Sequence, residues 1–162
     1  MPIPEFIVAL REHIGTASLW LPAVAAVVVR PTAGGSGGDE VLLVRRADTG
    51  AWTPVTGILD PAEEPAVGAV REVLEETGVV AVADRLVWAH ATPEIEFENG
   101  DRSTFLSLCF RCSWVSGEPF AADDESVDAG WFPVDALPEL GAEQRRRVDL
   151  ALANAPEAVF AR

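Results

Sequence analysis

Apolar positions recur along the chain with two different periods, which predict helices and strands in mixed order. Residues 4–14 and 66–77 carry apolar side chains at helical spacing, and a third helix is expected over residues 142–153. Runs rich in β-branched residues predict strands over residues 21–30, 41–46, 79–91, 104–115 and 131–134. This order predicts an α/β (α+β) domain in which helices and a sheet form layers.

Turn-forming residues mark the connections between these elements. The glycine-rich stretch 34–38 predicts a flexible loop at the tip of a hairpin formed by the first two strands. Asn99 and Gly100 predict a turn between the two long strands, and residues 54–65 are rich in turn formers before the central helix. Gly78 predicts the end of that helix.

The chain is predicted to fold as a single domain over residues 1–162, with residues 1–16 appended as an N-terminal helix. Its 49% hydrophobic and 23% charged residues are typical of a globular protein. The longest apolar run, residues 19–29, is too short to cross a bilayer and lacks a preceding basic region. We therefore expect a cytoplasmic protein.

The formal net charge of −14 argues against binding to long nucleic acid, because the protein and the phosphates repel each other at long range. An anionic substrate therefore needs divalent cations or well-placed arginines. All twelve basic residues are arginines, which coding bias explains more simply than function. The last predicted helix carries Arg145, Arg146 and Arg147 on a face that we expect to be solvated.

Cys109 and Cys112 form a C-x-x-C pattern inside a predicted strand. Their odd offset directs the two side chains to opposite faces of the sheet. The sequence offers no second Cys or His pair with metal-ligand spacing. We expect two ordinary buried or half-buried thiols.

The predicted central helix carries three carboxylates on one face, because Glu72, Glu75 and Glu76 stand at positions i, i+3 and i+4. Like charges at this spacing repel, and a bound divalent cation would compensate them. Hard oxygen ligands favour Mg²⁺ or Mn²⁺, and Arg71 is placed to offset part of the charge. The alternative interpretation is a solvated acidic helix face.

The segment from Gly57 to Val79 resembles the Nudix box, G-x5-E-x7-R-E-U-x-E-E-x-G-U, in which U is aliphatic. Every fixed position matches: Gly57, Glu63, Arg71, Glu72, Val73, Glu75, Glu76, Gly78 and Val79. The order of strands around the box and residues 122–140 also look like Nudix domains. The resemblance implies an α/β/α sandwich around a mixed sheet, with the box as a loop-helix-loop.

The resemblance also implies roles for individual residues. Glu72, Glu75 and Glu76 would bind the metal ions, with the carbonyl of Thr56 as a further ligand. The structural supports would be Gly57, Glu63, Arg71 and Gly78. Family members differ in the general base, so Glu72 and a glutamate from a later loop both remain open. In that loop Glu125 is the first candidate for an extra metal ligand or the base, and its rivals are Glu94, Glu96 and Glu98.

Candidates for substrate contacts are fewer and less specific. Arg45 and Arg46 end a strand, so they point to opposite faces and only one can reach the site as a phosphate clamp. Aromatic residues that could stack on a base are Trp52, Phe97 and Trp131, although each could equally pack in the core or at its rim. Pro93 lies near the marker proline of ADP-ribose-cleaving relatives, and Thr56 replaces a glycine of the usual lead-in to the box.

The intact acidic set favours a metal-dependent pyrophosphohydrolase. Its expected substrate is a nucleoside diphosphate linked to another moiety, such as ADP-ribose, a nucleotide sugar or a nucleoside triphosphate. Attack of a metal-activated water on phosphorus is the expected chemistry. Alternatives are a non-catalytic nucleotide sensor, and an isomerase or RNA-end-processing enzyme on the same fold. A small anion is the expected partner, and a homodimer is an open possibility.

Overall fold

A mixed sheet forms the centre of the molecule in a computed structural model that describes residues 3–32 and 38–161. In this part of the chain the sheet has nine strands. The helices are α1 (Glu5–Ile14), α2 (Pro65–Thr77) and α3 (Ala142–Ala153). The strands are β1 (Leu19–Pro31), β2 (Asp39–Arg46), β3 (Trp52–Thr53), β4 (Val55–Ile58), β5 (Val80–Ala91), β6 (Ile95–Glu96), β7 (Arg102–Ser116), β8 (Ser126–Pro133) and β9 (Val159–Phe160).

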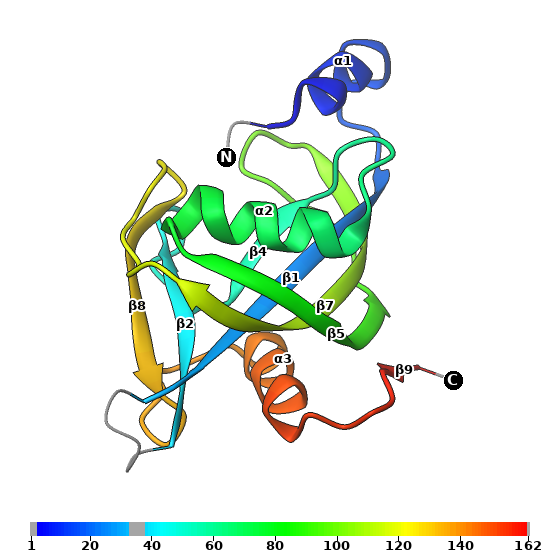
Figure 1. Ribbon diagram of the computed structural model, residues 1–162. Coiled ribbons are helices and arrows are strands. Elements are labelled where there is room, and N and C mark those ends of the chain that lie inside the picture. The colour runs from blue at the N-terminus through cyan, green and yellow to red at the C-terminus, as the bar shows by residue number, and fades with distance from the viewer. Residues whose placement is uncertain (1–2, 33–37, 162) are drawn as a thin grey trace.

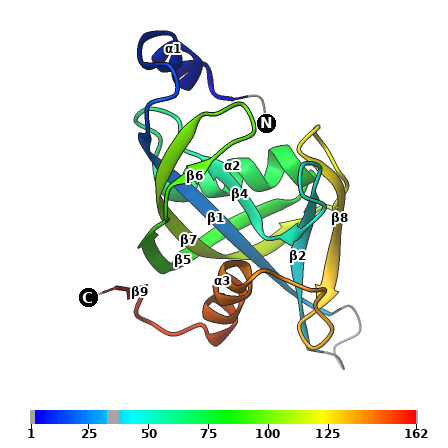
Figure 2. The same cartoon turned by 180° about the vertical axis from the view of Figure 1, so that it is seen from behind.

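The long strand β1 organises the sheet. It pairs parallel with β7 along most of its length, and antiparallel with β4 and then β2 on its other side. The main strand order is β3-β2-β1-β7-β5-β9, while β8 pairs with β2 and β6 with β7. Figures 1 and 2 show β1 crossing the whole domain diagonally. One strand thereby joins β4, which precedes α2, to β7, and β7 in turn pairs with β5.

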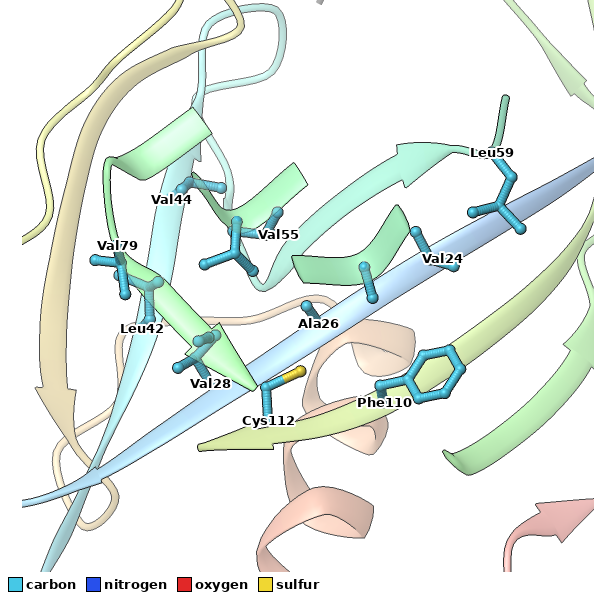
Figure 3. Close-up of a cluster of buried hydrophobic side chains, with 13 residues drawn as sticks. Val24, Ala26, Val28, Leu42, Val44, Val55, Leu59, Val79, Phe110 and Cys112 are labelled. Atoms are coloured by element: carbon cyan, nitrogen blue, oxygen red, sulfur yellow. The ribbon is translucent and has the colours of Figure 1, made fainter. Parts of the chain in front are cut away.

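The apolar run in β1 is buried on both faces, which explains its unbroken hydrophobic sequence. Val24, Ala26 and Val28 face one core, which α2 covers with Ala69 and Val73. Figure 3 shows side chains of this core, including Leu42, Val55 and Phe110.

The opposite core receives the intervening β1 residues Ala25, Val27 and Val29. Helix α3 covers it with Val148 and Ala151. The two helices therefore lie on opposite faces of the sheet, as expected for an α/β/α sandwich with a mixed sheet.

Most predicted elements are confirmed. Helix α3 has the predicted bounds, and α1 and α2 begin within a residue of prediction and end as predicted. The hairpin is confirmed by the pairing of Val29 with Val41, while residues 33–37 of its predicted loop lie outside the described residues. Cys109 and Cys112 are free and buried in opposite cores, as their odd offset predicts.

The prediction of a loop over residues 54–65 was wrong in part. Val55–Ile58 forms β4, which pairs with Ala23–Ala26 of β1. The two-residue strands β3, β6 and β9 were not predicted, and β8 begins at Ser126 rather than at Trp131. These strands depend on hydrogen bonds to distant partners, which a local hydrophobic pattern does not reveal.

The solvated face predicted for the three arginines of α3 was wrong for Arg147. Arg145 and Arg146 are exposed, whereas Arg147 is buried. Its guanidinium donates hydrogen bonds to Ser107 Oγ at 3.1 Å, Glu143 Oε1 at 2.6 Å and Gln144 Oε1 at 3.0 Å. Polar side chains of β7 and of α3 itself thus compensate its burial.

Helix α1 lies outside the sandwich, against the turn before β7 (Figure 2). Its Ile7 packs with Leu21 and Phe105, and Arg11 donates a hydrogen bond to the carbonyl of Arg102 at 2.8 Å. Helix α1 therefore docks on the body of the domain. None of the helices in the described ranges has the length and apolar character needed to cross a membrane.

We expect Leu42→Ala to lower the free energy of unfolding by about 2–5 kcal/mol, because the side chain is fully buried in the α2-side core. The matched control is Leu74→Ala, since Leu74 is 50% exposed and its truncation should cost less than about 0.5 kcal/mol. Urea denaturation of both variants measures the difference. Equal losses in the two variants would contradict the assignment of the core.

Candidate active site

The start of α2 is clamped to the preceding loop by a two-point ion pair. Arg71 Nε lies 2.7 Å from Glu63 Oε1, and its Nη2 lies 2.9 Å from Glu63 Oε2. The backbone N–H of Asp60 also donates to Glu63 Oε2 at 3.1 Å. Hydrogen bonding from Arg71 lowers the pKa of Glu63, which keeps this carboxylate ionised. Bidentate geometry of this kind fixes orientation as well as charge.

Gly68 allows this clamp to close, and sequence reasoning missed its role. A Cβ at position 68 would collide with Leu59 and lie 2.8 Å from Glu63 Oε2. A glycine inside a helix costs about 1 kcal/mol relative to alanine, so its presence there was a signal of close packing. The loop and the helix therefore approach each other closely at this point.

Glu72 is a buried carboxylate that is only half partnered. Arg71 Nη1 donates to its Oε1 at 2.9 Å, but no group among residues 3–32 and 38–161 donates to its Oε2. Burial raises the pKa of Glu72 to about 7, although Arg71 opposes the shift. A Cβ at Gly57 would collide with this carboxyl group. The backbone of Thr56 and Gly57 in β4 therefore passes directly beside Glu72.

Glu76 is the second buried carboxylate, with only 3% of its surface exposed. In the described part of the chain its Oε1 also has no hydrogen-bond partner. Burial, together with the negative charges of Glu125, Glu72 and Asp123, raises its pKa to about 8. The structure thus brings Glu125, from the loop after β7, into the electrostatic surroundings of the central helix.

Glu75 differs from its two neighbours because its side chain is 52% exposed. Arg71 Nη1 binds its Oε2 at 2.9 Å, the same distance as to Glu72 Oε1. No three His, Cys, Asp or Glu side chains of the described residues stand together as a preformed metal cluster. Arg71 thus binds one oxygen each of Glu72 and Glu75. Two buried carboxylate oxygens have no hydrogen-bond partner among the described residues, Glu72 Oε2 and Glu76 Oε1, and we call them the orphan oxygens.

The loop before β8 is attached to the end of α2. The N–H groups of Phe120 and Ala122 donate to the carbonyls of Thr77 and Glu76 at 3.2 Å and 3.0 Å. The three rivals of Glu125 lie elsewhere, since Glu94, Glu96 and Glu98 belong to the hairpin around β6. Glu94 is within 3.8 Å of Arg102, on that hairpin. The arrangement therefore favours Glu125 over these three.

The side chains of Arg45 and Arg46 have different surroundings. The hydrogen bond from Arg46 to Asp48 is the main cause that raises the pKa of Arg46, and the charges of Glu125 and Glu76 contribute less. Arg45 instead donates to the carbonyl of Gly50 at 3.1 Å and lines a surface cavity of about 370 Å³. Adjacent strand residues point to opposite faces, so only Arg46 is directed to the side of the glutamates.

The predicted aromatic contacts are also divided between the two faces. Trp52 packs in the α3-side core and meets Phe132 edge to face at 4.8 Å, so the sheet separates it from Glu72 and Glu76. Trp131 lies on the α2 side, but the guanidinium of Arg30 covers its ring at 4.2 Å. Phe97 is 44% exposed and stands in the turn after β6. The rings of Trp52 and Trp131 are thus already engaged in packing.

The amino-acid sequence matches a family model and several known proteins. The model of the NUDIX domain matches residues 20–152. The NAD-capped RNA hydrolase NudC of Pseudomonas aeruginosa (strain LESB58) is 37% identical over 122 residues, which are 72% of this chain and 41% of that protein. The MutT-like protein of Streptomyces ambofaciens is 35% identical over 121 residues, which are 75% of this chain and 69% of that protein.

The fold has counterparts among solved structures. The crystal structure of an ADP-ribose pyrophosphatase from Streptococcus suis 89-1591 aligns with a TM-score of 0.62 and 24% identity. The alignment covers 87% of this chain and 96% of that one. This likeness is one of fold, and it agrees with the sandwich described above.

We expect the metal-free protein to lose stability as the pH rises through the range in which Glu76 ionises. The folded pKa of about 8 exceeds the ordinary value of 4.5, so the folded state binds more protons between these values and stability falls with rising pH. Glu76→Gln removes this contribution, on the order of a few kcal/mol. Thermal melts in EDTA between pH 5 and 9 measure it.

Glu75→Gln is the matched control, because Glu75 is half exposed and paired with Arg71. The stability of this variant should still fall as the pH rises through the range in which Glu76 ionises. Parallel stability curves for wild type and Glu76→Gln would contradict the burial of an ionisable Glu76.

Proposed function

Because the chain belongs to the NUDIX family of hydrolases, we propose that it is a metal-dependent pyrophosphohydrolase that cleaves a nucleoside diphosphate linked to another moiety. The observation that carries this proposal is the pair of orphan oxygens, Glu72 Oε2 and Glu76 Oε1, buried on one face of α2. Two buried carboxylate oxygens with no donor are costly unless a cation binds them. They are therefore well suited to hold one.

The donor set fits Mg²⁺ or Mn²⁺, which prefer oxygen ligands and keep positions open for water and substrate phosphates. Glu72 and Glu76 would supply the inner carboxylates, with Glu75 and the backbone carbonyl of Thr56 as further ligands. The close packing of Gly57 on Glu72 supports the proximity of Thr56. When bound, the ion would lower the pKa of an attacking water and neutralise charge on the phosphates.

The remaining residues of the box would act on the ligands rather than on the substrate. Arg71 orients Glu72 and Glu75, and Glu63 anchors Arg71, so the ligand carboxylates are held before any ion binds. The proton of the attacking water would pass to a glutamate, for which Glu125 and Glu72 are the two candidates. We favour Glu125, because Arg71 already occupies one oxygen of Glu72.

The expected substrate is a small nucleotide such as ADP-ribose, a nucleotide sugar or a nucleoside triphosphate. The name of the NudC relative is that of an RNA hydrolase, which conflicts in part with the prediction that no long nucleic acid binds. This chain spans only 41% of that protein, and its net charge is −14. We therefore place small nucleotides first. A cytoplasmic location and a homodimer remain predictions.

The alternative function is a nucleotide-binding module without catalysis. Such a module would tolerate the loss of some acidic residues, yet every glutamate of the box is present in this chain. The site residues also keep their supporting contacts, from Glu63 through Arg71 to Glu72. These observations favour the hydrolase.

We expect metal-dependent release of phosphate or nucleotide from one class of a panel containing nucleoside triphosphates, ADP-ribose, nucleotide sugars, dinucleoside polyphosphates and a short NAD-capped RNA. Glu76→Gln should lower kcat by about 100-fold or more, because it replaces a metal ligand. Leu74→Ala, on an exposed position of the same helix, is the matched control and should keep wild-type rates.

The panel also separates the two functions. Tight metal-dependent binding of a nucleotide without turnover would refute the hydrolase and support the binding module. Turnover of the capped RNA alone would show that the prediction against long nucleic acid was wrong.

We expect Arg46→Ala to raise KM for the substrate by about tenfold or more, since a charged hydrogen bond to phosphate is worth roughly 1.5–3 kcal/mol. Arg46 lies on the side of Glu76 and Glu125, where a phosphate bound to the metal would stand. Arg45→Ala is the control, because Arg45 lies on the opposite face of β2. Steady-state kinetics of both variants test the assignment, and equal effects would contradict it.

A further inference from the structure

The segment of residues 117–125 connects β7 to β8 and lies beside the end of α2, where Figure 1 shows it in yellow. It contributes no residue to the box, yet it carries Asp123 and Glu125. Both carboxylates act electrostatically on Glu76. The contacts that hold this segment therefore decide where two of the acidic groups of the site stand.

The first contacts are backbone hydrogen bonds to the end of the helix. Phe120 N–H donates to the carbonyl of Thr77 at 3.2 Å, and Ala122 N–H donates to the carbonyl of Glu76 at 3.0 Å. The last carbonyls of a helix have no partner within the helix, so these bonds satisfy them. These two bonds attach the segment to the end of α2 a few residues before Glu125.

The second contact is the ring of Phe120 on Gly78. Gly78 has φ of 70°, and any Cβ at this position would collide with the ring. Gly117 has φ of 90°, and a Cβ there would lie 2.9 Å from the carbonyl oxygen of Gly78. The segment can lie this close to the helix end only because both positions lack a side chain.

The third set of contacts anchors the two ends of the segment. Arg30 Nη1 lies 2.8 Å from Glu118 Oε1, and Trp114 Nε1 donates to the carbonyl of Gly117 at 2.9 Å. At the other end, Ala47 N–H donates to the carbonyl of Glu125 at 2.7 Å. Residues 117–125 are thus attached at both ends and in the middle, although Phe120 itself is 58% exposed.

We propose that Phe120 is a positioning residue for the hydrolytic reaction: its ring, seated on Gly78, holds residues 117–125 against α2 and so sets where Glu125 and Asp123 stand relative to Glu76. This inference rests on the proposed function. The ring contacts Gly78 closely even though it is 58% exposed. Phe120 acts through Glu125 and does not touch the reacting atoms.

The test is a double-mutant cycle of Phe120→Ala and Glu125→Gln in the metal-loaded enzyme. Phe120→Ala should lower kcat by on the order of 10- to 100-fold with KM nearly unchanged, because a small displacement of a reacting group has this effect. When Glu125→Gln is already present, adding Phe120→Ala should lower kcat by less than about twofold, because the carboxylate through which Phe120 acts is no longer there. Phe120→Tyr keeps the ring and should restore most of the rate.

The matched control is Phe160→Ala. Phe160 is equally exposed, at 58%, but lies in β9 beside β5, away from the helix end. It should keep wild-type kinetics. Additive effects of Phe120→Ala and Glu125→Gln would overturn the proposal, as would a rise in KM alone, which would make Phe120 a substrate contact.

A second measurement separates this inference from the proposed function. Amide hydrogen exchange should lose protection at positions 120 and 122 in Phe120→Ala but not in Phe160→Ala. Calorimetric titration with Mn²⁺ should show weaker binding for Phe120→Ala alone, because the negative charges of Glu125 and Asp123 would move away from Glu76. Absence of wild-type turnover would refute the hydrolase, and these two readouts would still decide the role of Phe120. Unchanged protection and unchanged Mn²⁺ affinity would overturn it.

Discussion

The candidate site depends on the hydrogen bonds that the guanidinium of Arg71 donates to three glutamates. These glutamates are Glu63, Glu72 and Glu75, so the guanidinium connects the loop before α2 to two turns of the helix. Without it, the glutamates of one helix face would repel each other and the loop would lose its anchor. The same contacts direct one oxygen of Glu72 away from Arg71. By binding Glu72 Oε1, Arg71 leaves Glu72 Oε2 as the oxygen without a hydrogen-bond partner in the described residues.

The burial of Glu72 and Glu76 disfavours the folded state, and the proposed cation would offset this cost. Both carboxylates are buried, and burial disfavours their charged forms. Arg71 compensates part of the charge of Glu72, and none of the contacts found in the described residues does the same for Glu76 Oε1. Buried carboxylate oxygens without a partner are typical of sites that a ligand completes.

The sheet divides the molecule into a face with the acidic site and a face without it. Alternation along β2 sends Arg46 towards the glutamates and Arg45 to the side of α3. The segment after β7 reaches the acidic face by following the end of α2. The resulting site draws on the central helix, the end of β2 and a loop about fifty residues downstream in the sequence.

The sequence by itself determined the helices, the long strands and the box, because these depend on local periodicity and on fixed spacing within one helix. It also determined that Arg45 and Arg46 face opposite ways, but not which of them faces the glutamates. Only the tertiary structure decided that, since a strand pattern does not tell which face a distant helix will cover. The same holds for β4, whose pairing with β1 brings Gly57 against Glu72, for the buried Arg147, and for Phe120 on Gly78. Each of these depends on contacts between segments far apart in the sequence.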